Sequence, residues 1–264
     1  MQAETPPKER SYPVLGVDIS THSRDDFFET VTQALDQRNG TKQPLFIVTV
    51  NPEIAIETIV DNEFNQILHQ SSINTADGVG ISWAVHFLYG IHIDRITGSD
   101  SVEKICGIAA EKDNSVFLYG AMPGIAERAA QLLQQKIDKL HVSGTFAPER
   151  PDIDFEDLPS FVQQQLKDAN VIFVALGAPA QEKWIHRNLK FLPNCKVIIG
   201  IGGTFDFITG EIKRAPVFMR KAGLEWMYRL YAQPSRWRRM LKLPLFALNV
   251  ILLRASMQIP KSSS

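Results

Sequence analysis

Short runs of β-branched and aromatic residues alternate with longer segments of helical periodicity along most of this chain. Strands are predicted at residues 13–19, 45–50, 72–75, 115–119, 141–146, 171–176 and 196–201. Helices are predicted at residues 23–37, 52–70, 80–89, 99–112, 124–140, 158–167 and 179–191, with N-caps at Ser23 and Ser99. Strands separated by helices form crossover units, which build parallel sheets. The pattern therefore predicts an α/β protein whose core is a Rossmann-like, mainly parallel sheet.

The alternation stops near Lys213, where the charge of the chain changes sign. Residues 1–212 carry 17 Lys and Arg against 28 Asp and Glu, a net charge of −11. Residues 213–264 carry 11 against one, a net charge of +10. We therefore divide the chain into a Rossmann-like core at 1–212 and a C-terminal basic, aromatic, helical appendage at 213–264. Such concentrated positive charge favours an anionic partner.

Polar residues follow several of the predicted strands. Thr49 and Asn51 close one strand, Asp77 follows the next, and the segments 177–182 and 200–203 follow two others. Parallel strands bring their carboxyl ends to one edge of a sheet, and ligands of open α/β sheets bind outside that edge. We expect these residues to converge there and to form the active site.

Asp77 stands in the stretch INTADGVGISW, residues 73–83, where a strand gives way to a helix. Its carboxylate could cap the helix by accepting from free backbone N–H groups. It could also act as a general base, held rigidly while Gly78 and Gly80 let a substrate approach the backbone. The spacing alone leaves both roles open.

The stretch GIGGTFDFITG, residues 200–210, is rich in glycine after a strand. Its backbone N–H groups could hold phosphate oxygens, although a tight structural turn fits as well. It is not the dinucleotide fingerprint, because Phe205 stands where the third glycine is required. It is not a P-loop either, because no Gly-Lys-Ser/Thr follows.

No metal site or cofactor is predicted. Asp152 and Asp154 resemble the Asp-x-Asp pair of many glycosyltransferases, but they stand before a helix, where acidic residues are also favourable. The six histidines show no ligand spacing. Cys106 and Cys195 form no disulfide framework, which is typical of a reducing compartment.

The appendage combines arginines and aromatic residues with an apolar run at 243–253. This pattern is typical of a helix on an anionic lipid surface, although a helix packed on the core also fits. No nucleic-acid motif accompanies the charge, and no nucleic-acid partner is predicted. The sequence shows neither a signal peptide nor an 18-residue apolar stretch, so we expect a cytoplasmic protein at the inner membrane face.

Seven segments together resemble the WecG/TagA/CpsF glycosyltransferase family. They are TVNPE at 49–53, ADGVGISWA at 76–84, RITGSD at 95–100, LGAPAQEKW at 176–184, GIGGTFDFITG at 200–210, RAP at 214–216 and GLEWMYRL at 223–230. The resemblance implies inverting transfer of a sugar, N-acetylmannosamine or a related hexose, from a UDP-sugar to a polyprenyl-diphosphate-linked sugar in cell-surface polysaccharide synthesis.

The resemblance also implies roles for individual residues. Asp77 matches the catalytic base. The substrate-binding residues it implies are Thr49, Asn51, Arg95, Gln181, Arg229, Arg236 and Arg239. Gly202 and Gly203 are added to them, because the amides of the glycine-rich loop could hold phosphate oxygens.

Two other classes of function stay open from the residues alone. A Rossmann-type NAD-dependent oxidoreductase is disfavoured by the missing fingerprint. A non-catalytic lipid- or nucleic-acid-binding module is disfavoured by the polar residues at the strand ends. The donor sugar and the oligomeric state are not determined, and a homo-oligomer stays open.

Overall fold

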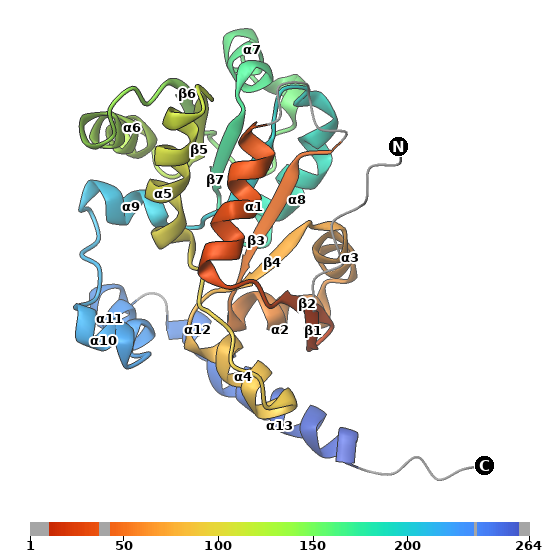
Figure 1. Cartoon of the computed structure of the whole chain (residues 1–264). Helices are drawn as coiled ribbons and strands as arrows, with labels where there is room; N and C mark the ends of the chain where they lie inside the picture. Colours follow the sequence, from red (N-terminus) through yellow and green to blue (C-terminus); the bar gives the residue numbers. More distant parts are fainter. Residues whose placement is uncertain (1–10, 37–42, 235–236, 259–264) are drawn as a thin grey trace.

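The computed structural model describes residues 11–36, 43–234 and 237–258, and a six-stranded parallel sheet forms its centre (Figure 1). The strands lie in the spatial order β4-β3-β8-β7-β5-β6. Their bounds are β3 Leu45–Val50, β4 Ile73–Ala76, β5 Val116–Gly120, β6 Val142–Phe146, β7 Val171–Ala175 and β8 Val197–Gly200. Each agrees with a predicted strand to within one residue at either end, so the predicted α/β, Rossmann-like class is confirmed.

Helices cover both faces of this sheet (Figure 1). One face packs against α1 Arg24–Asp36, α5 Gly98–Glu111, α6 Ile125–Lys136 and α9 Thr204–Thr209. The other packs against α2 Pro52–Val60, α3 Asn62–Gln70, α4 Val79–Tyr89, α7 Ser160–Asp168 and α8 Ala180–Asn188. Two short 3₁₀ helices complete this part of the chain. The first, η1 Phe155–Asp157, precedes α7, and the second, η2 Leu189–Phe191, follows α8.

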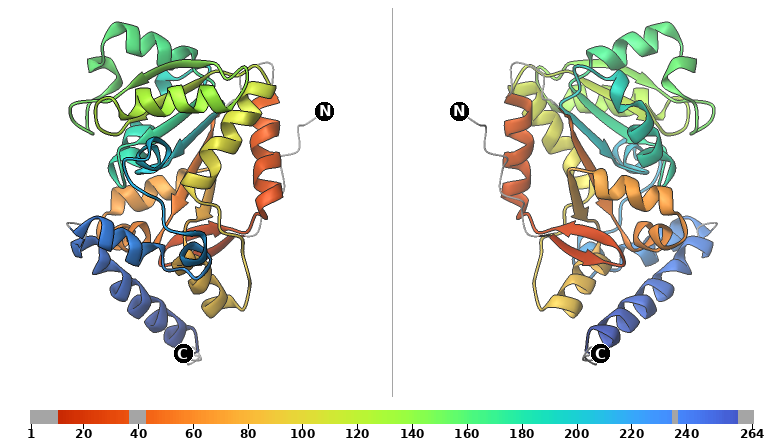
Figure 2. Two further views of the ribbon diagram at one scale, coloured as in Figure 1. Left: turned by 90° about the vertical axis from the view of Figure 1, so that its left-hand side faces the viewer. Right: turned by 90° about the vertical axis from the view of Figure 1, so that its right-hand side faces the viewer.

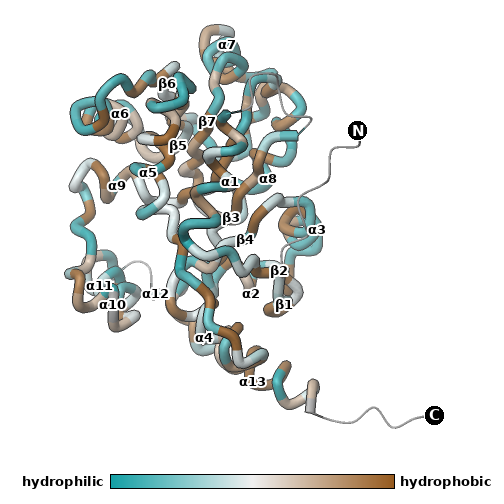
Figure 3. Tube along the Cα trace, viewed as in Figure 1, coloured by the Kyte–Doolittle hydropathy of each residue, from teal (hydrophilic) through white to brown (hydrophobic). Residues whose placement is uncertain are grey.

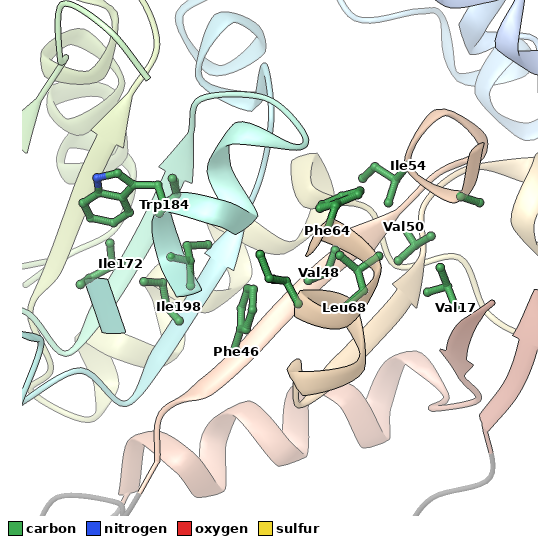
Figure 4. Close-up of a cluster of buried hydrophobic side chains, with 14 of the residues drawn as sticks. Val17, Phe46, Val48, Val50, Ile54, Phe64, Leu68, Ile172, Trp184 and Ile198 are labelled. Atoms are coloured by element: carbon green, nitrogen blue, oxygen red, sulfur yellow. The ribbon is translucent and has the colours of Figure 1, made fainter. Parts of the chain in front are cut away.

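Covering both faces explains why the strands are continuous apolar runs. Side chains alternate across a strand, so Phe46, Val48 and Val50 enter one hydrophobic cluster while Ile47 enters the other. Figure 4 shows the first cluster, in which Phe64 of α3 lies over β3. The sheet is therefore held by apolar burial on both sides, and only its ends are left for polar chemistry.

One predicted strand, at 13–19, is wrong, because the chain folds back on itself there. The structure has an antiparallel hairpin of β1 Ser11–Val14 and β2 Val17–Ser20. Its two turn residues, Leu15 and Gly16, both have positive φ angles, of 50° and 88°. Leucine rarely adopts a positive φ angle, so Leu15 gave no turn signal. Gly16 was the one turn-forming residue visible in the sequence between the two strands.

Several helix boundaries differ from prediction. The helix predicted at 124–140 ends at Lys136, and the one predicted at 179–191 ends at Asn188 and continues as η2. The helix predicted at 52–70 breaks at Asp61, whose carboxylate caps α3 by accepting from the N–H of Phe64 at 2.9 Å. The α5 helix is capped by Thr97, which accepts from the N–H of Asp100 at 3.2 Å, and not by Ser99. The cap at Ser23 is confirmed, since its hydroxyl accepts from the N–H of Asp26 at 3.1 Å.

The described residues after 212 are largely helical, as predicted. They form α10 Val217–Lys221, α11 Glu225–Ala232, α12 Trp237–Met240 and α13 Lys242–Gln258. The last of these contacts α2 and α4, and its Phe246 and Val250 are buried in the core (Figure 2). None of the helices in the described segments has the length and apolar character needed to cross a bilayer. The division at residue 212 stays a prediction.

We predict that the close approach of β5 and β7 depends on Gly120. Its φ angle is +104°, and an added Cβ would lie 2.7 Å from the carbonyl carbon and oxygen of Ala175. Gly120→Ala should lower the free energy of unfolding by at least about 2 kcal/mol, because backbone strain and overpacking combine. The check is the urea midpoint at constant m-value.

The matched control is Gly107→Ala, in the interior of α5, where an added Cβ would meet no atom within 4 Å. This change should leave stability equal or raise it by up to about 1 kcal/mol, because alanine is the better helix former. Equal urea midpoints for the two variants would contradict the account.

Candidate active site

Two joined pockets open beyond the carboxyl ends of the strands. The larger has a volume of about 550 Å³ and lies over the ends of β3 and β4, between the core and helices α10 to α13. The smaller, about 110 Å³, lies over the ends of β3, β8 and β7. The residues that line both are Asn51, Glu53, Asp77, Ser99, Arg229 and Arg239. The predicted convergence of strand-end residues is confirmed, since β4, β3, β8 and β7 are neighbours in the sheet.

Asp77 lies where the two pockets meet. The α4 helix that follows it is capped by Gly78, which has a φ angle of +87°, so the helix-capping alternative for Asp77 is wrong. The Asp77 carboxylate makes no hydrogen bond to any side chain or backbone group in the described part of the chain. Burial raises the pKa of this carboxyl to about 7, and the charge of Arg229 opposes that rise. A carboxyl with a pKa near neutrality suits proton transfer.

The glycines after Asp77 differ in role. Gly78 lines the larger pocket, where its positive φ angle favours glycine. A Cβ on Gly80 would lie 2.4 Å from the Cγ of Pro52, so this glycine lets α2 and α4 approach each other. Gly80 lines the larger pocket too, so it serves close helix packing and also leaves room in the pocket wall.

Thr49 and Asn51 lie at the end of β3, as predicted. The Thr49 hydroxyl donates to the carbonyl oxygen of Gly200 at 3.1 Å, which joins the ends of β3 and β8. The Asn51 side chain accepts from the N–H of Ile54 at 3.0 Å and caps α2. Both residues line the smaller pocket and at the same time hold its walls in place.

Gln181 connects the loops that follow β7 and β8. Its Oε1 accepts from the N–H of Gly177 at 3.2 Å and from the N–H of Gly202 at 3.0 Å. Its Nε2 donates to Oε1 of Glu182 at 2.7 Å, and burial raises the pKa of Glu182 to about 7. Glu182 therefore fixes which end of the Gln181 amide faces the two loops.

The glycine-rich stretch at 200–210 is partly helical. After β8 the chain turns at Gly202, which has a φ angle of +53°, and Gly203 leads directly into α9. Both glycines line the smaller pocket. Because Gly202 donates its N–H to Gln181, that amide is already engaged and is not free to hold a phosphate.

Arginines converge on the larger pocket from several elements. Arg95 donates to the carbonyl oxygen of Arg220 at 3.3 Å. Arg229, on α11, lies over the ring of Phe207, 4.6 Å from its centroid. Arg239, on α12, pairs with Glu53 at 3.2 Å. Arg236 lies outside the described residues.

Several lining residues were missed by sequence analysis. Arg214, Arg220, Glu53 and Glu225 also line the larger pocket, and Arg214 pairs with Asp100 at 2.8 Å. Each stands in or beside one of the seven segments that carry the family resemblance, and that proximity was the available signal. Periodicity could not find Glu53, Arg220 and Glu225, because charged residues on helices are usually solvated.

The acidic pair Asp152 and Asp154 lies away from both pockets. Asp154 pairs with Arg187 at 3.2 Å, and Asp152 lies 3.6 Å from Arg150. Within the described segments, no group of three or more His, Cys, Asp or Glu is placed to hold a metal ion. Cys106 and Cys195 are buried free thiols. These features contribute to the fold rather than to the walls of the pockets.

Comparison with known proteins identifies the family. The model of the glycosyl transferase WecG/TagA/CpsF family matches residues 12–259. An N-acetylglucosaminyldiphosphoundecaprenol N-acetyl-beta-D-mannosaminyltransferase of Bacillus subtilis is 36% identical over 222 residues, 82% of this chain and 81% of that protein. The protein of that name from Staphylococcus aureus strain MRSA252 is 33% identical over 239 residues, 90% of this chain and 91% of its own length. The chain belongs to the WecG/TagA/CpsF family of glycosyltransferases.

Proposed function

We propose that this glycosyltransferase moves a hexose-type sugar, N-acetylmannosamine or a related one, from a UDP-sugar to a sugar carried on a polyprenyl diphosphate, with inversion. The observation that carries the proposal is a carboxylate, Asp77, at the junction of two pockets whose shared wall also holds Arg229 and Arg239. The names of the relatives support the acceptor class and the sugar. Membership of a glycosyltransferase family removes the oxidoreductase alternative.

Asp77 is the proposed general base. It takes the proton from the acceptor hydroxyl while the hydroxyl oxygen forms its bond to the anomeric carbon and the bond to the UDP oxygen breaks. A direct displacement of this kind needs one base and no covalent intermediate. A single carboxylate with a pKa of about 7 can accept the proton at neutral pH.

The smaller pocket is the proposed entry for the donor. Its 110 Å³ is below the range of about 300–1,000 Å³ typical of small-molecule sites, so a nucleotide sugar must extend past Asp77 into the larger pocket. Thr49, Gln181 and Gly203 line the enclosed part of that path. Because the amide of Gly202 is engaged, we assign the developing charge of UDP chiefly to arginine side chains.

The arginines on α11 and α12 are the proposed partners of the diphosphates. Arg239 would exchange Glu53 for a phosphate oxygen, and Arg229 is held over Phe207 within reach of both pockets. On the family resemblance, Arg236 is assigned to the acceptor's diphosphate and Arg95 to the pocket. The enzyme would act at the cytoplasmic face of an anionic membrane, with α13 at the lipid surface and no metal required.

The test is a UDP-release assay across UDP-hexoses, with a short-chain diphosphate-linked sugar as the acceptor and with EDTA in a parallel arm. We expect UDP release that depends on the acceptor for one donor and survives EDTA. Release that no UDP-hexose supports would contradict the donor assignment. Activity that EDTA abolishes and magnesium or manganese restores would contradict the metal-free mechanism.

The general base is tested in the same assay with Asp77→Asn. Asparagine keeps the size of the side chain but cannot accept the proton, so turnover should fall by at least about 100-fold. The thermal melting temperature should stay close to that of the parent protein, because the Asp77 carboxylate makes no hydrogen bond to the described residues. Turnover near the parent value in a folded variant would remove Asp77 from this role.

The pH dependence tests the electrostatic effect of Arg229 on Asp77. Only the ionised carboxylate is a base, so kcat/KM should rise with pH and level off above a midpoint near pH 7. Arg229→Met removes a positive charge that favours the ionised form, so the midpoint should move upward by about half a unit or more. Arg229→Lys should lower turnover, since it loses the bidentate fork, but should keep the midpoint.

The control for the pH profile is Arg128→Met, which removes an exposed arginine paired with Glu211 on the surface. Its midpoint should equal that of the parent protein. An unmoved midpoint in Arg229→Met would show that this arginine does not act on the titrating group.

A further inference from the structure

The larger pocket has two chemically distinct halves. Near Asp77 its wall carries polar and positively charged side chains, among them Arg95 and Arg229. The rest of the wall is apolar, and it is contributed by Val79, Trp83, Trp226, Met240, Leu243, Pro244, Phe246 and Ala247. A ligand that fills this pocket must be polar at one end and apolar at the other.

The apolar half continues outward along α4. Val79, Trp83 and Phe87 are spaced four residues apart, so they form one stripe about 12 Å long that starts beside the Asp77 loop. The rings of Trp83 and Phe87 stack with centroids 5.3 Å apart. These side chains are 42%, 37% and 38% exposed, which is unusual for a row of large apolar residues.

Helix α13 forms the other side of this apolar path. It contacts α4, and its Leu243 and Ala247 line the pocket. At the far end Arg254 donates to the carbonyl oxygen of Leu88, which ties the two helices together. Figure 2 shows α13 extending away from the sheet, and Figure 3 shows hydrophobic residues along both helices.

We infer that the apolar half of the pocket, continued by Trp83 and Phe87 on α4, binds the first isoprenoid units of the acceptor's lipid tail. This inference rests on the proposed function and adds to it a binding site for the tail. Charge complementarity decides the orientation, because the diphosphate lies beside the arginines and the tail can then leave only across the apolar wall. The relatives are named for an acceptor with such a tail.

Two other occupants could cover this apolar surface, a lipid bilayer or a second copy of the protein. The concave shape of the pocket favours a single isoprenoid chain over both. The stripe begins inside the pocket, two residues from Asp77, where neither a flat bilayer surface nor a second copy can follow it. An isoprenoid chain is thin enough to enter the pocket and apolar along its whole length. It would cover Trp83 and Phe87 as it leaves.

The experiment measures how acceptor use depends on tail length. The acceptors are the methyl, geranyl and farnesyl esters of N-acetylglucosaminyl diphosphate, each below its critical micelle concentration, without detergent or vesicles. UDP release with the donor found in the screen should give a kcat/KM at least about tenfold higher for farnesyl than for methyl. The higher kcat/KM should come from a lower KM at unchanged kcat, because the tail does not touch the reacting atoms.

Two variants locate the site. In Trp83→Gln the farnesyl-to-methyl ratio of kcat/KM should fall to less than about one-third of the parent ratio. In Phe87→Gln, farther from Asp77, the farnesyl advantage should shrink while the geranyl advantage stays. Phe161→Gln on α7 is the matched control, since it also replaces an exposed aromatic residue but lies away from both pockets, and it should keep the parent ratio.

The outcomes separate this inference from the proposed function. Equal use of methyl and farnesyl acceptors by the parent protein would overturn the tail site and leave the proposed function intact. A Trp83→Gln ratio equal to the parent, or a Phe161→Gln ratio reduced to the same extent, would overturn it too. A length effect that appears only when vesicles are added would make this surface a membrane contact instead. If no acceptor is used, the proposed function fails and the tail site with it.

Discussion

Burial of both faces of the parallel sheet is the constraint on which the rest of the structure depends. Alternate residues of β3, β7 and β8 enter opposite hydrophobic clusters, so neither face of the sheet is free to bind a polar ligand. Polar ligands can therefore bind only at the carboxyl ends of the strands. There the loops that follow β4, β3, β8 and β7 lie side by side, because these strands are neighbours in the sheet. The hydrogen bonds from Thr49 to Gly200, and from Gly177 and Gly202 to Gln181, join those ends into a rigid wall.

The same constraint gives Asp77 its chemical character. It follows a strand whose residues are all buried, and it lies at the base of a pocket closed by helices from the other end of the chain. Removal from water raises the pKa of its carboxyl, while Arg229 limits that rise. Helices α11 and α12 therefore shape the surroundings of the carboxylate, since Arg229 opposes the rise of its pKa and both helices bring the arginines that the proposed diphosphates require.

Much of the fold followed from the sequence because buried strands and amphipathic helices leave strong periodic signals. The six sheet strands could be predicted to within a residue, whereas the turn at Leu15 could not, because a leucine with positive φ gives no local signal. The break at Asp61 was also missed, since this one residue ends α2 with its backbone N–H and begins α3 with its carboxylate.

The site was predictable only in part. Residues at strand ends could be expected to converge, and the resemblance to the family supplied their roles, which stay proposals. The ion pair of Arg239 with Glu53 depends on long-range packing, which single-sequence patterns do not encode. The hydrogen bond that engages the Gly202 amide could not be predicted for the same reason, because its partner, Gln181, is 21 positions away in the sequence.

The central claim is that a single carboxylate serves a direct displacement at the anomeric carbon. The most direct measurement is the anomeric configuration of the newly formed glycosidic bond, determined by NMR on product isolated early in the reaction. We expect inversion relative to the donor, because one base and no covalent intermediate permit a single attack from the opposite face. Retention of configuration would contradict it, since two successive displacements would require a nucleophile that this account does not contain.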